Sequence, residues 1–245
     1  MDATPAPDPS LLTSPPIPAR LPFGPLKRFG LFGGSFDPVH VGHLSIAQQI
    51  MNALKLEKVI LLPAATAPHK REGGGSVASA EDRLEMCRLA VHNMHNLEVS
   101  DFEIVRGGVS YTVETARQIR AAYGPDAEIF FLIGSDSLVD LPQWYEIREL
   151  LSLINFAIAE RREAPILLSL WKRLGVEFGE DAAKRLRAGV AKVQRVDISS
   201  TLIRELLATN QKIPGYLRGD VESYIRKKGL YGALPRSAGN TPART

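Results

Sequence analysis

The sequence predicts an α/β protein with a doubly wound, mostly parallel sheet and a small C-terminal helical part. Short continuous apolar runs alternate with segments in which apolar residues recur at helical spacing. Three of these runs stop at glycine or proline, as strands that enter tight turns do. Because buried strands that alternate with helices are joined by crossovers, neighbouring strands are expected to be parallel.

The first half of the predicted domain begins with a strand over residues 28–34, an apolar run that two glycines end. Apolar residues at helical spacing follow over residues 41–55, and residues 58–62 form a second buried strand that a proline stops. A helix near residues 79–92 is indicated by the capping residue Ser79 and by acidic residues in the first turn.

The second half continues the same alternation. Residues 97–104 are predicted as a strand, residues 111–123 as a helix that a Gly-Pro pair ends, and residues 128–133 as a buried strand followed by glycine. The remaining predicted elements are a helix over residues 143–152, strands over 156–159 and 191–196, and helices over 199–208 and 217–228. Ligands of open parallel sheets bind at the carboxyl ends of the strands.

Composition fits one packed domain, predicted over residues 28–232. The 245 residues are 44% hydrophobic and 23% charged, which excludes a disordered, collagen-like or disulfide-stapled chain. Residues 1–27 are rich in proline and are expected to form a disordered extension, and residues 233–245 a flexible tail. Cys87 is the one cysteine, so neither an internal disulfide nor a cysteine-based metal site is expected.

The formal net charge of +3 comes from the two ends of the chain. Residues 29–232 carry 25 basic and 25 acidic side chains, so we expect no nucleic-acid partner. No apolar run reaches 18 residues, and the beginning of the chain lacks a basic start followed by an apolar run. We therefore expect a cytoplasmic protein with no membrane partner.

The first chemical motif lies where the first predicted strand meets its helix. It reads Gly33-Gly34-Ser35-Phe36-Asp37-Pro38-Val39-His40-Val41-Gly42-His43. The glycines let the backbone approach a phosphate, and the following helix start points amide donors at an anion. The two histidines share one face and can donate hydrogen bonds to phosphate oxygens. The alternatives are a glycine turn with two surface histidines, or a zinc pair, for which no third ligand follows at a sensible spacing.

The second motif is Ile198-Ser199-Ser200-Thr201-Leu202-Ile203-Arg204, which enters a helix after the last predicted strand. Hydroxyl side chains at a helix start cap the helix and leave amide donors for an anion. Arg204 lies one turn further on and can reach the same phosphate. An ordinary capped helix with a surface arginine is the alternative interpretation.

Both motifs, in this order, resemble the two signatures of the HxGH nucleotidyltransferase superfamily, which has a Rossmann-like fold. The resemblance implies that His40, His43 and Arg204 are the catalytic residues and that the histidines bind the triphosphate. The residues that it implies for ATP binding are Gly33, Gly34, Ser35, Phe36, His40, His43, Gly134, Asp136, Ile198, Ser199, Ser200 and Arg204.

Three further segments resemble the bacterial nicotinate-mononucleotide adenylyltransferases. They are the segment from Ile133-Gly134-Ser135-Asp136 to Trp144, the Pro68-His69-Lys70 element, and Ser110-Tyr111-Thr112-Val113-Glu114-Thr115. The resemblance implies that Asp136 contacts ribose, Trp144 stacks on the pyridine ring, Lys70 lies near phosphates and Thr112 helps to recognise the carboxylate. Taken by themselves, Trp144 could be a packing residue, Asp136 a helix cap, and residues 69–76 a mobile flap around a basic turn. The stretch over residues 161–190 matches these enzymes only weakly.

The function that this resemblance implies is transfer of AMP from ATP to nicotinate mononucleotide, giving deamido-NAD and pyrophosphate. Mg²⁺ is expected to arrive with ATP, and no protein metal site is expected. A monomer or a small homo-oligomer is expected. Two alternatives stay open: the same transfer to another acceptor, nicotinamide mononucleotide or phosphopantetheine, or a regulatory module that binds ATP without turnover.

Overall fold

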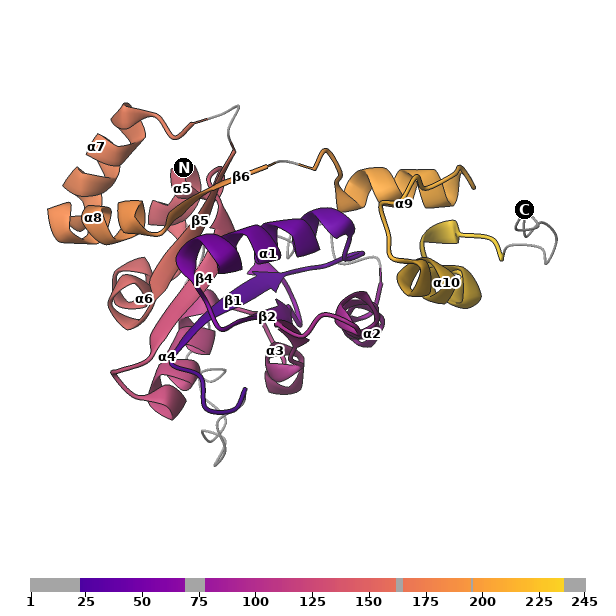
Figure 1. Cartoon of the computed structure of the whole chain (residues 1–245), viewed down its shortest axis with the longest axis horizontal. Coiled ribbons are helices and arrows are strands. Elements are labelled where there is room, and N and C mark those ends of the chain that lie inside the picture. The colour runs from indigo at the N-terminus through magenta and orange to yellow at the C-terminus, as the bar shows by residue number, and fades with distance from the viewer. Residues whose placement is uncertain (1–22, 69–77, 162–164, 195, 236–245) are drawn as a thin grey trace.

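Six parallel strands form one sheet in the order β3-β2-β1-β4-β5-β6 (Figure 1). The structure is a computed structural model, which describes residues 23–68, 78–161, 165–194 and 196–235. The strands are β1 (Arg28–Gly34), β2 (Lys58–Pro63), β3 (Leu97–Val99), β4 (Glu128–Gly134), β5 (Asn155–Arg161) and β6 (Val190–Val193). This strand order confirms the doubly wound parallel fold, with the direction of winding reversed between β1 and β4.

Helices cover both faces of the sheet and meet the two sets of side chains that alternate along each strand. One face packs against α1 (Val41–Leu54), α2 (Ala80–Val91), α9 (Ser200–Ala208) and α10 (Gly219–Lys228). The other packs against α4 (Thr112–Tyr123), α6 (Ile147–Leu153), α7 (Leu168–Phe178) and α8 (Glu180–Ala188). Figure 1 shows α7 and α8 at one end of the molecule and α9 and α10 at the other.

The prediction of a strand over residues 97–104 is wrong beyond Val99. Strand β3 has three residues and is followed by a short helix, α3 (Phe102–Arg106). The side chain of Glu103 is 3% exposed, and its Oε1 accepts a hydrogen bond of 2.7 Å from the Thr115 hydroxyl. This contact with α4 turns the chain out of the sheet, which a local apolar pattern does not reveal.

Three other sequence expectations also need correction. The helix predicted over residues 143–152 begins only at Ile147, as α6, because Trp144 has an extended and Glu146 a left-handed backbone; a short helix α5 (Ser137–Asp140) and a 3-10 turn η3 (Leu141–Gln143) precede it. The last strand ends at Val193 and not at residue 196. Helices α7 and α8 lie within the stretch 161–190, to which we assigned no element; their amphipathic faces bury Trp171, Leu174 and Leu186.

The packed part of the chain extends slightly beyond the expected bounds of 28 and 232. The ring of Phe23 stacks on Tyr123 at a centroid distance of 6.3 Å, and the Phe23 amide donates to the Tyr123 hydroxyl at 3.0 Å. At the other end, Ala233 is buried after the 3-10 turn η4 (Leu230–Gly232). Across the described ranges, no helix has the length and apolarity needed to cross a membrane.

Candidate active site

The two predicted motif segments after β1 and β4 begin side by side. Because β1 and β4 are neighbouring parallel strands, their carboxyl ends lie at the same edge of the sheet, at the point where the winding reverses. This is the position at which open α/β sheets bind ligands. Residues 33–43 run from the end of β1 into the first turn of α1, and residues 134–136 run from the end of β4 to the residue before α5.

The two histidines of the first motif form a stacked pair at the start of α1. Their ring centroids are 3.7 Å apart, with an angle of 26° between the planes. His40 is the extended residue that precedes the helix, and its backbone amide donates to Nδ1 of His43 at 3.2 Å. Since Nδ1 accepts this bond, a neutral His43 carries its proton on Nε2 and can donate it to an anion.

Neighbouring residues leave room for these rings and hold them. A Cβ atom on Gly42 would lie 2.9 Å from Nδ1 of His40, so this glycine makes space for the ring. The ring of Phe36 meets His43 edge-on at a centroid distance of 5.1 Å, and Phe36 reaches this place with a left-handed backbone, φ 47°. Nδ1 of His40 is buried without a hydrogen-bond partner among the described residues. The pair is therefore preset in one arrangement.

Burial keeps both imidazoles neutral near pH 7. It lowers the pKa of His40 from 6.5 to about 4. The pKa of His43 also lies well below its usual value, because of burial and then the nearby His40. A bound triphosphate opposes this effect, since negative charge favours the imidazolium form.

Folding stability is therefore expected to fall on acidification. The pKa of His40 is about 4 in the folded state and 6.5 as the ordinary value. The unfolded chain consequently binds the proton first, and the stability contribution is lost as the pH falls from 6.5 to 4. Between pH 7 and pH 5 we expect His40→Asn to lose about 2 kcal/mol less free energy of unfolding than the wild type, as measured by urea denaturation. His95→Asn, at an exposed position, is the control. Equal pH dependence in both variants would contradict a depressed pKa for His40.

The second motif docks directly on the first. The hydroxyl of Ser200 donates to the carbonyl of Pro38 at 2.9 Å, and Nη1 of Arg204 donates to the carbonyl of Asp37 at 2.8 Å. Ser199 caps α9 by accepting from the Leu202 amide at 3.1 Å, as the sequence predicted. The structure thus brings Arg204 to the loop that leads into His40, although the two motifs are far apart in the sequence.

Arg83 is a structural residue of the site that sequence reasoning missed. The residue is 1% exposed, and its guanidinium donates to the backbone carbonyls of Ser35 at 2.8 Å, Ala64 at 2.7 Å and Ala65 at 3.1 Å. A further bond of 3.3 Å reaches the carbonyl of Ala78. One arginine therefore fastens the loops after β1 and β2 together. Its signal was present, because it lies one helical turn before the buried Cys87 on the apolar face of α2.

The segment around Thr112 is held at the same edge of the sheet. The Ser110 hydroxyl accepts from the amide of Ala65 at 3.0 Å, and the Ser110 amide donates to the carbonyl of Thr66 at 2.9 Å. Thr112 is the first residue of α4. Beside it, the ring of Tyr111 lies 4.7 Å from that of Tyr145, the residue after Trp144. The two predicted acceptor segments are thus neighbours.

Trp144 packs on the core and also remains partly exposed. Its ring meets Phe131 edge-on at 6.2 Å and Phe156 at 6.1 Å between centroids. These contacts support the packing interpretation of this residue. The side chain is only half-buried, so part of its ring remains exposed.

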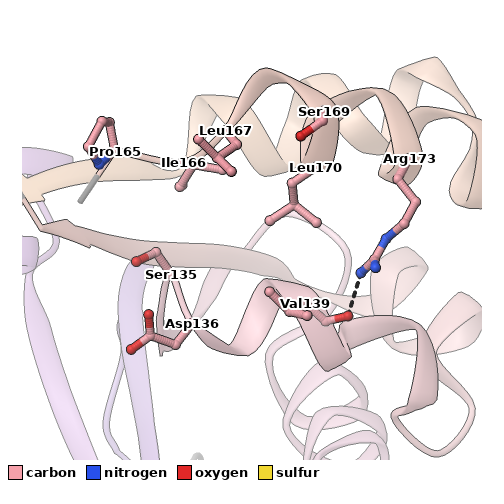
Figure 2. Close-up of a pocket in the computed structure, with 9 residues that line it drawn as sticks. All are labelled: Ser135, Asp136, Val139, Pro165, Ile166, Leu167, Ser169, Leu170 and Arg173. Carbon is pink, nitrogen blue, oxygen red and sulfur yellow. Dashed lines mark hydrogen bonds between the residues drawn. The ribbon is translucent and has the colours of Figure 1, made fainter.

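A cavity of about 430 Å³ opens beside Asp136, between α5 and the beginning of α7 (Figure 2). Ser135 and Asp136 form one wall, and Ile166 and Leu170 lie opposite. At its far end, Arg173 donates to the carbonyl of Val139. Asp136 occupies the N-cap position of α5, as the alternative interpretation expected, but its side chain makes no capping hydrogen bond.

The remaining predicted site residues are Lys70, Ile198, Gly33 and Gly34, and the structure describes all of them except Lys70. Lys70 and the segment 69–76 lie outside the described residues. Ile198 is half-buried just before α9, and Gly33 and Gly34 form the end of β1. The amide of Val41, at the start of α1, donates to the carbonyl of Tyr216 at 3.0 Å, so the protein itself engages one amide that we expected to face an anion. No group of three or more metal-ligating side chains gathers within the part of the chain that the structure describes.

Comparison with known proteins first defines the class. A family model described as Cytidylyltransferase-like matches residues 31–206, from β1 to α9, and so contains both motifs. In the solved nicotinic acid mononucleotide adenylyltransferase of Plasmodium falciparum complexed with NaAD, the fold is similar. The TM-score is 0.65 at 21% identity, over 84% of this chain and 98% of that one. The fold and the docked motifs are those of a nucleotidyltransferase of this class.

Sequence relatives narrow the class to one family. The chain is 37% identical to the probable nicotinate-nucleotide adenylyltransferase of Gemmatimonas aurantiaca over 87% of this chain and 97% of that protein. It is 39% identical to the probable nicotinate-nucleotide adenylyltransferase of Shouchella clausii over 84% and 98%. This chain belongs to the nicotinate-nucleotide adenylyltransferase family.

Proposed function

We propose that this protein transfers AMP from ATP to nicotinate mononucleotide, giving deamido-NAD and pyrophosphate in NAD biosynthesis. The observation that carries this proposal is the docking of Arg204 on the loop that leads into the stacked pair His40 and His43. Family membership supports the choice of reaction. We further propose that the protein acts in the cytoplasm, as a monomer or small homo-oligomer, without a nucleic-acid or membrane partner.

In the proposed reaction, a phosphate oxygen of nicotinate mononucleotide attacks the α-phosphorus of ATP. A new phosphorus–oxygen bond forms, the bond to the bridging oxygen of the β-phosphate breaks, and pyrophosphate leaves with that oxygen. Mg²⁺ enters as part of the MgATP substrate. Because an ionised phosphate is already a nucleophile, the protein contributes positioning and charge stabilisation. Nε2 of His43, His40 and Arg204 supply donors to the charge that develops on the transferring phosphate.

We propose that ATP lies along the motif loops. The backbone of Gly33, Gly34, Ser35 and Phe36 would approach the phosphates, and Ile198, Ser199 and Ser200 would border the nucleotide. Asp136 would accept hydrogen bonds from a ribose diol. Its place on the wall of the cavity beside α5 supports this role, because a carboxylate there can meet a nucleoside.

We propose that the acceptor lies across the neighbouring segments. Thr112, at the start of α4, would recognise the nicotinate carboxylate through its hydroxyl or amide, where the helix dipole favours an anion. Trp144 would offer the exposed part of its ring to the pyridine. Lys70 would lie near the phosphates, and Asp136 would also serve the acceptor ribose.

A substitution at Gly134 tests whether ATP binds against the backbone at the end of β4. A Cβ atom there would meet nothing within 4 Å, so the fold tolerates a larger residue. If ATP approaches this backbone, Gly134→Val is expected to raise KM for ATP about tenfold, since overpacking costs about 1–3 kcal/mol and 1.4 kcal/mol is a factor of ten. Tm should stay unchanged. Gly219→Val, at the start of α10 and with equally open surroundings, is the matched control. Equal KM values in the two variants would contradict approach of ATP to Gly134.

The proposed function is tested with the full chain and MgATP. Nicotinate mononucleotide, nicotinamide mononucleotide and phosphopantetheine are supplied in turn, with a reaction lacking acceptor as control. Products are separated by chromatography and pyrophosphate is measured. We expect deamido-NAD and pyrophosphate in equal amounts, and a much higher kcat/KM for the acid than for its amide. Binding of ATP without pyrophosphate release for any acceptor would instead favour a regulatory module.

A further inference from the structure

Tyr231 connects the C-terminal end of the described chain to the first motif. It lies in η4, where its backbone adopts the left-handed conformation with φ 59°, and its side chain is 9% exposed. The Tyr231 hydroxyl donates to Oδ1 of Asp37 at 2.7 Å. The same oxygen accepts from the amide of Ala78 at 3.2 Å, and Asp37 is 2% exposed. The buried Tyr231 phenol therefore contacts the loop that leads into His40.

Asp37 connects this tyrosine to the arginine of the second motif. While its carboxylate is held by Tyr231, its backbone carbonyl accepts the 2.8 Å hydrogen bond from Nη1 of Arg204. The next carbonyl, that of Pro38, accepts from Ser200 at 2.9 Å. A displacement of the Asp37 backbone would therefore move the acceptor that orients the guanidinium of Arg204.

We infer that Tyr231 is a positioning residue, which acts through Asp37 to set the place of Arg204 for transfer of AMP. This inference rests on the proposed function of Arg204. A buried carboxylate that loses one of its donors moves toward the donors that remain or toward water, because each lost hydrogen bond to a buried charge is costly, and we expect the backbone of Asp37 to shift with its side chain. Burial and the neighbouring Asp37 raise the pKa of the Tyr231 phenol, so it remains a proton donor throughout the neutral range.

The chain offers a matched control in Tyr224 of α10. Its hydroxyl also donates to an aspartate oxygen, Oδ1 of Asp82, at 2.7 Å. Asp82 lies in the first turn of α2 and also pairs with Lys228 at 3.3 Å. Phenylalanine at either position removes the hydroxyl and, with it, the hydrogen bond from the C-terminal part to an aspartate of the body. Only the Tyr231 bond leads to the residue that holds Arg204.

The test measures kcat, KM for ATP and Tm for Tyr231→Phe, Tyr224→Phe, Arg204→Ala and the double variant Tyr231→Phe/Arg204→Ala. We expect Tyr231→Phe to lower kcat about tenfold, since a small misplacement of a catalytic group can cost up to about 100-fold. Tyr224→Phe should stay within about twofold of the wild type. In the Arg204→Ala background, Tyr231→Phe should lower kcat no further, because its effect passes through Arg204.

The outcomes separate this inference from the proposed function. Equal kcat values for the two tyrosine variants, or a tenfold loss that persists without Arg204, would overturn the inference while leaving the proposed function intact. An unchanged kcat in Arg204→Ala would contradict the role of Arg204 in the proposed function and the inference with it. A fall in Tm alone, equal in both tyrosine variants, would show a merely structural role for Tyr231.

Discussion

His43→Ala is expected to lower kcat for AMP transfer by about 100-fold, because loss of one preset donor to a developing oxyanion costs about 10²–10³ in rate. In the folded protein Nδ1 of His43 is occupied by the amide of His40 at 3.2 Å, so Nε2 is the nitrogen left to donate. Alanine also removes the ring on which His40 stacks at 3.7 Å. Steady-state turnover with saturating MgATP and nicotinate mononucleotide measures the effect.

Two comparisons make the His43 result specific. His43→Gln is expected to recover part of the rate, since its amide can donate from a similar distance along the side chain. His95→Ala changes an exposed histidine elsewhere and should leave kcat unaltered. Tm of each variant excludes unfolding as the cause. If His43→Ala kept kcat within twofold of the wild type, its proposed role at the α-phosphate would be wrong.

Arg83→Leu is expected to lower the free energy of unfolding by about 3–5 kcal/mol, as does removal of one partner from a buried charged network. The guanidinium satisfies four backbone carbonyls, and its charge lies near the buried carboxylate of Asp37. Leucine would remove the donor from all four carbonyls, of which those of Ala64 and Ala78 are bonded in the buried interior. Urea denaturation, followed by circular dichroism, measures the loss.

The same helix supplies the control for Arg83. Arg88 is exposed and pairs with Asp101 at 3.4 Å, so Arg88→Leu should cost less than about 1 kcal/mol. Arg83→Lys should be intermediate, because an ammonium cannot reproduce the planar fork of donors. Similar losses for Arg83→Leu and Arg88→Leu would mean that the hydrogen bonds to the two loops contribute little.

Agreement between sequence and structure is best where the signal is local and strong. The strands over residues 28–34, 58–62 and 128–133 are continuous apolar runs, and each agrees with its observed strand to within one residue. Ser79 and Ser199 cap the helices that they were expected to cap. By contrast, the end of β3 and the broken helix after β4 depend on contacts of Glu103 and Trp144 with distant residues, and periodicity does not record these.

The sequence by itself determined the α/β class and the two motifs, because hydrophobic periodicity and motif spacing are properties of neighbouring residues. Only the tertiary structure decided which groups meet. The bond from Arg204 to Asp37, the bonds of Arg83 to Ser35 and Ala64, and the contact of Tyr231 with Asp37 join segments far apart in the chain. Their formation depends on the strand order, which places β1 between β2 and β4 and thereby gathers the loops at one edge.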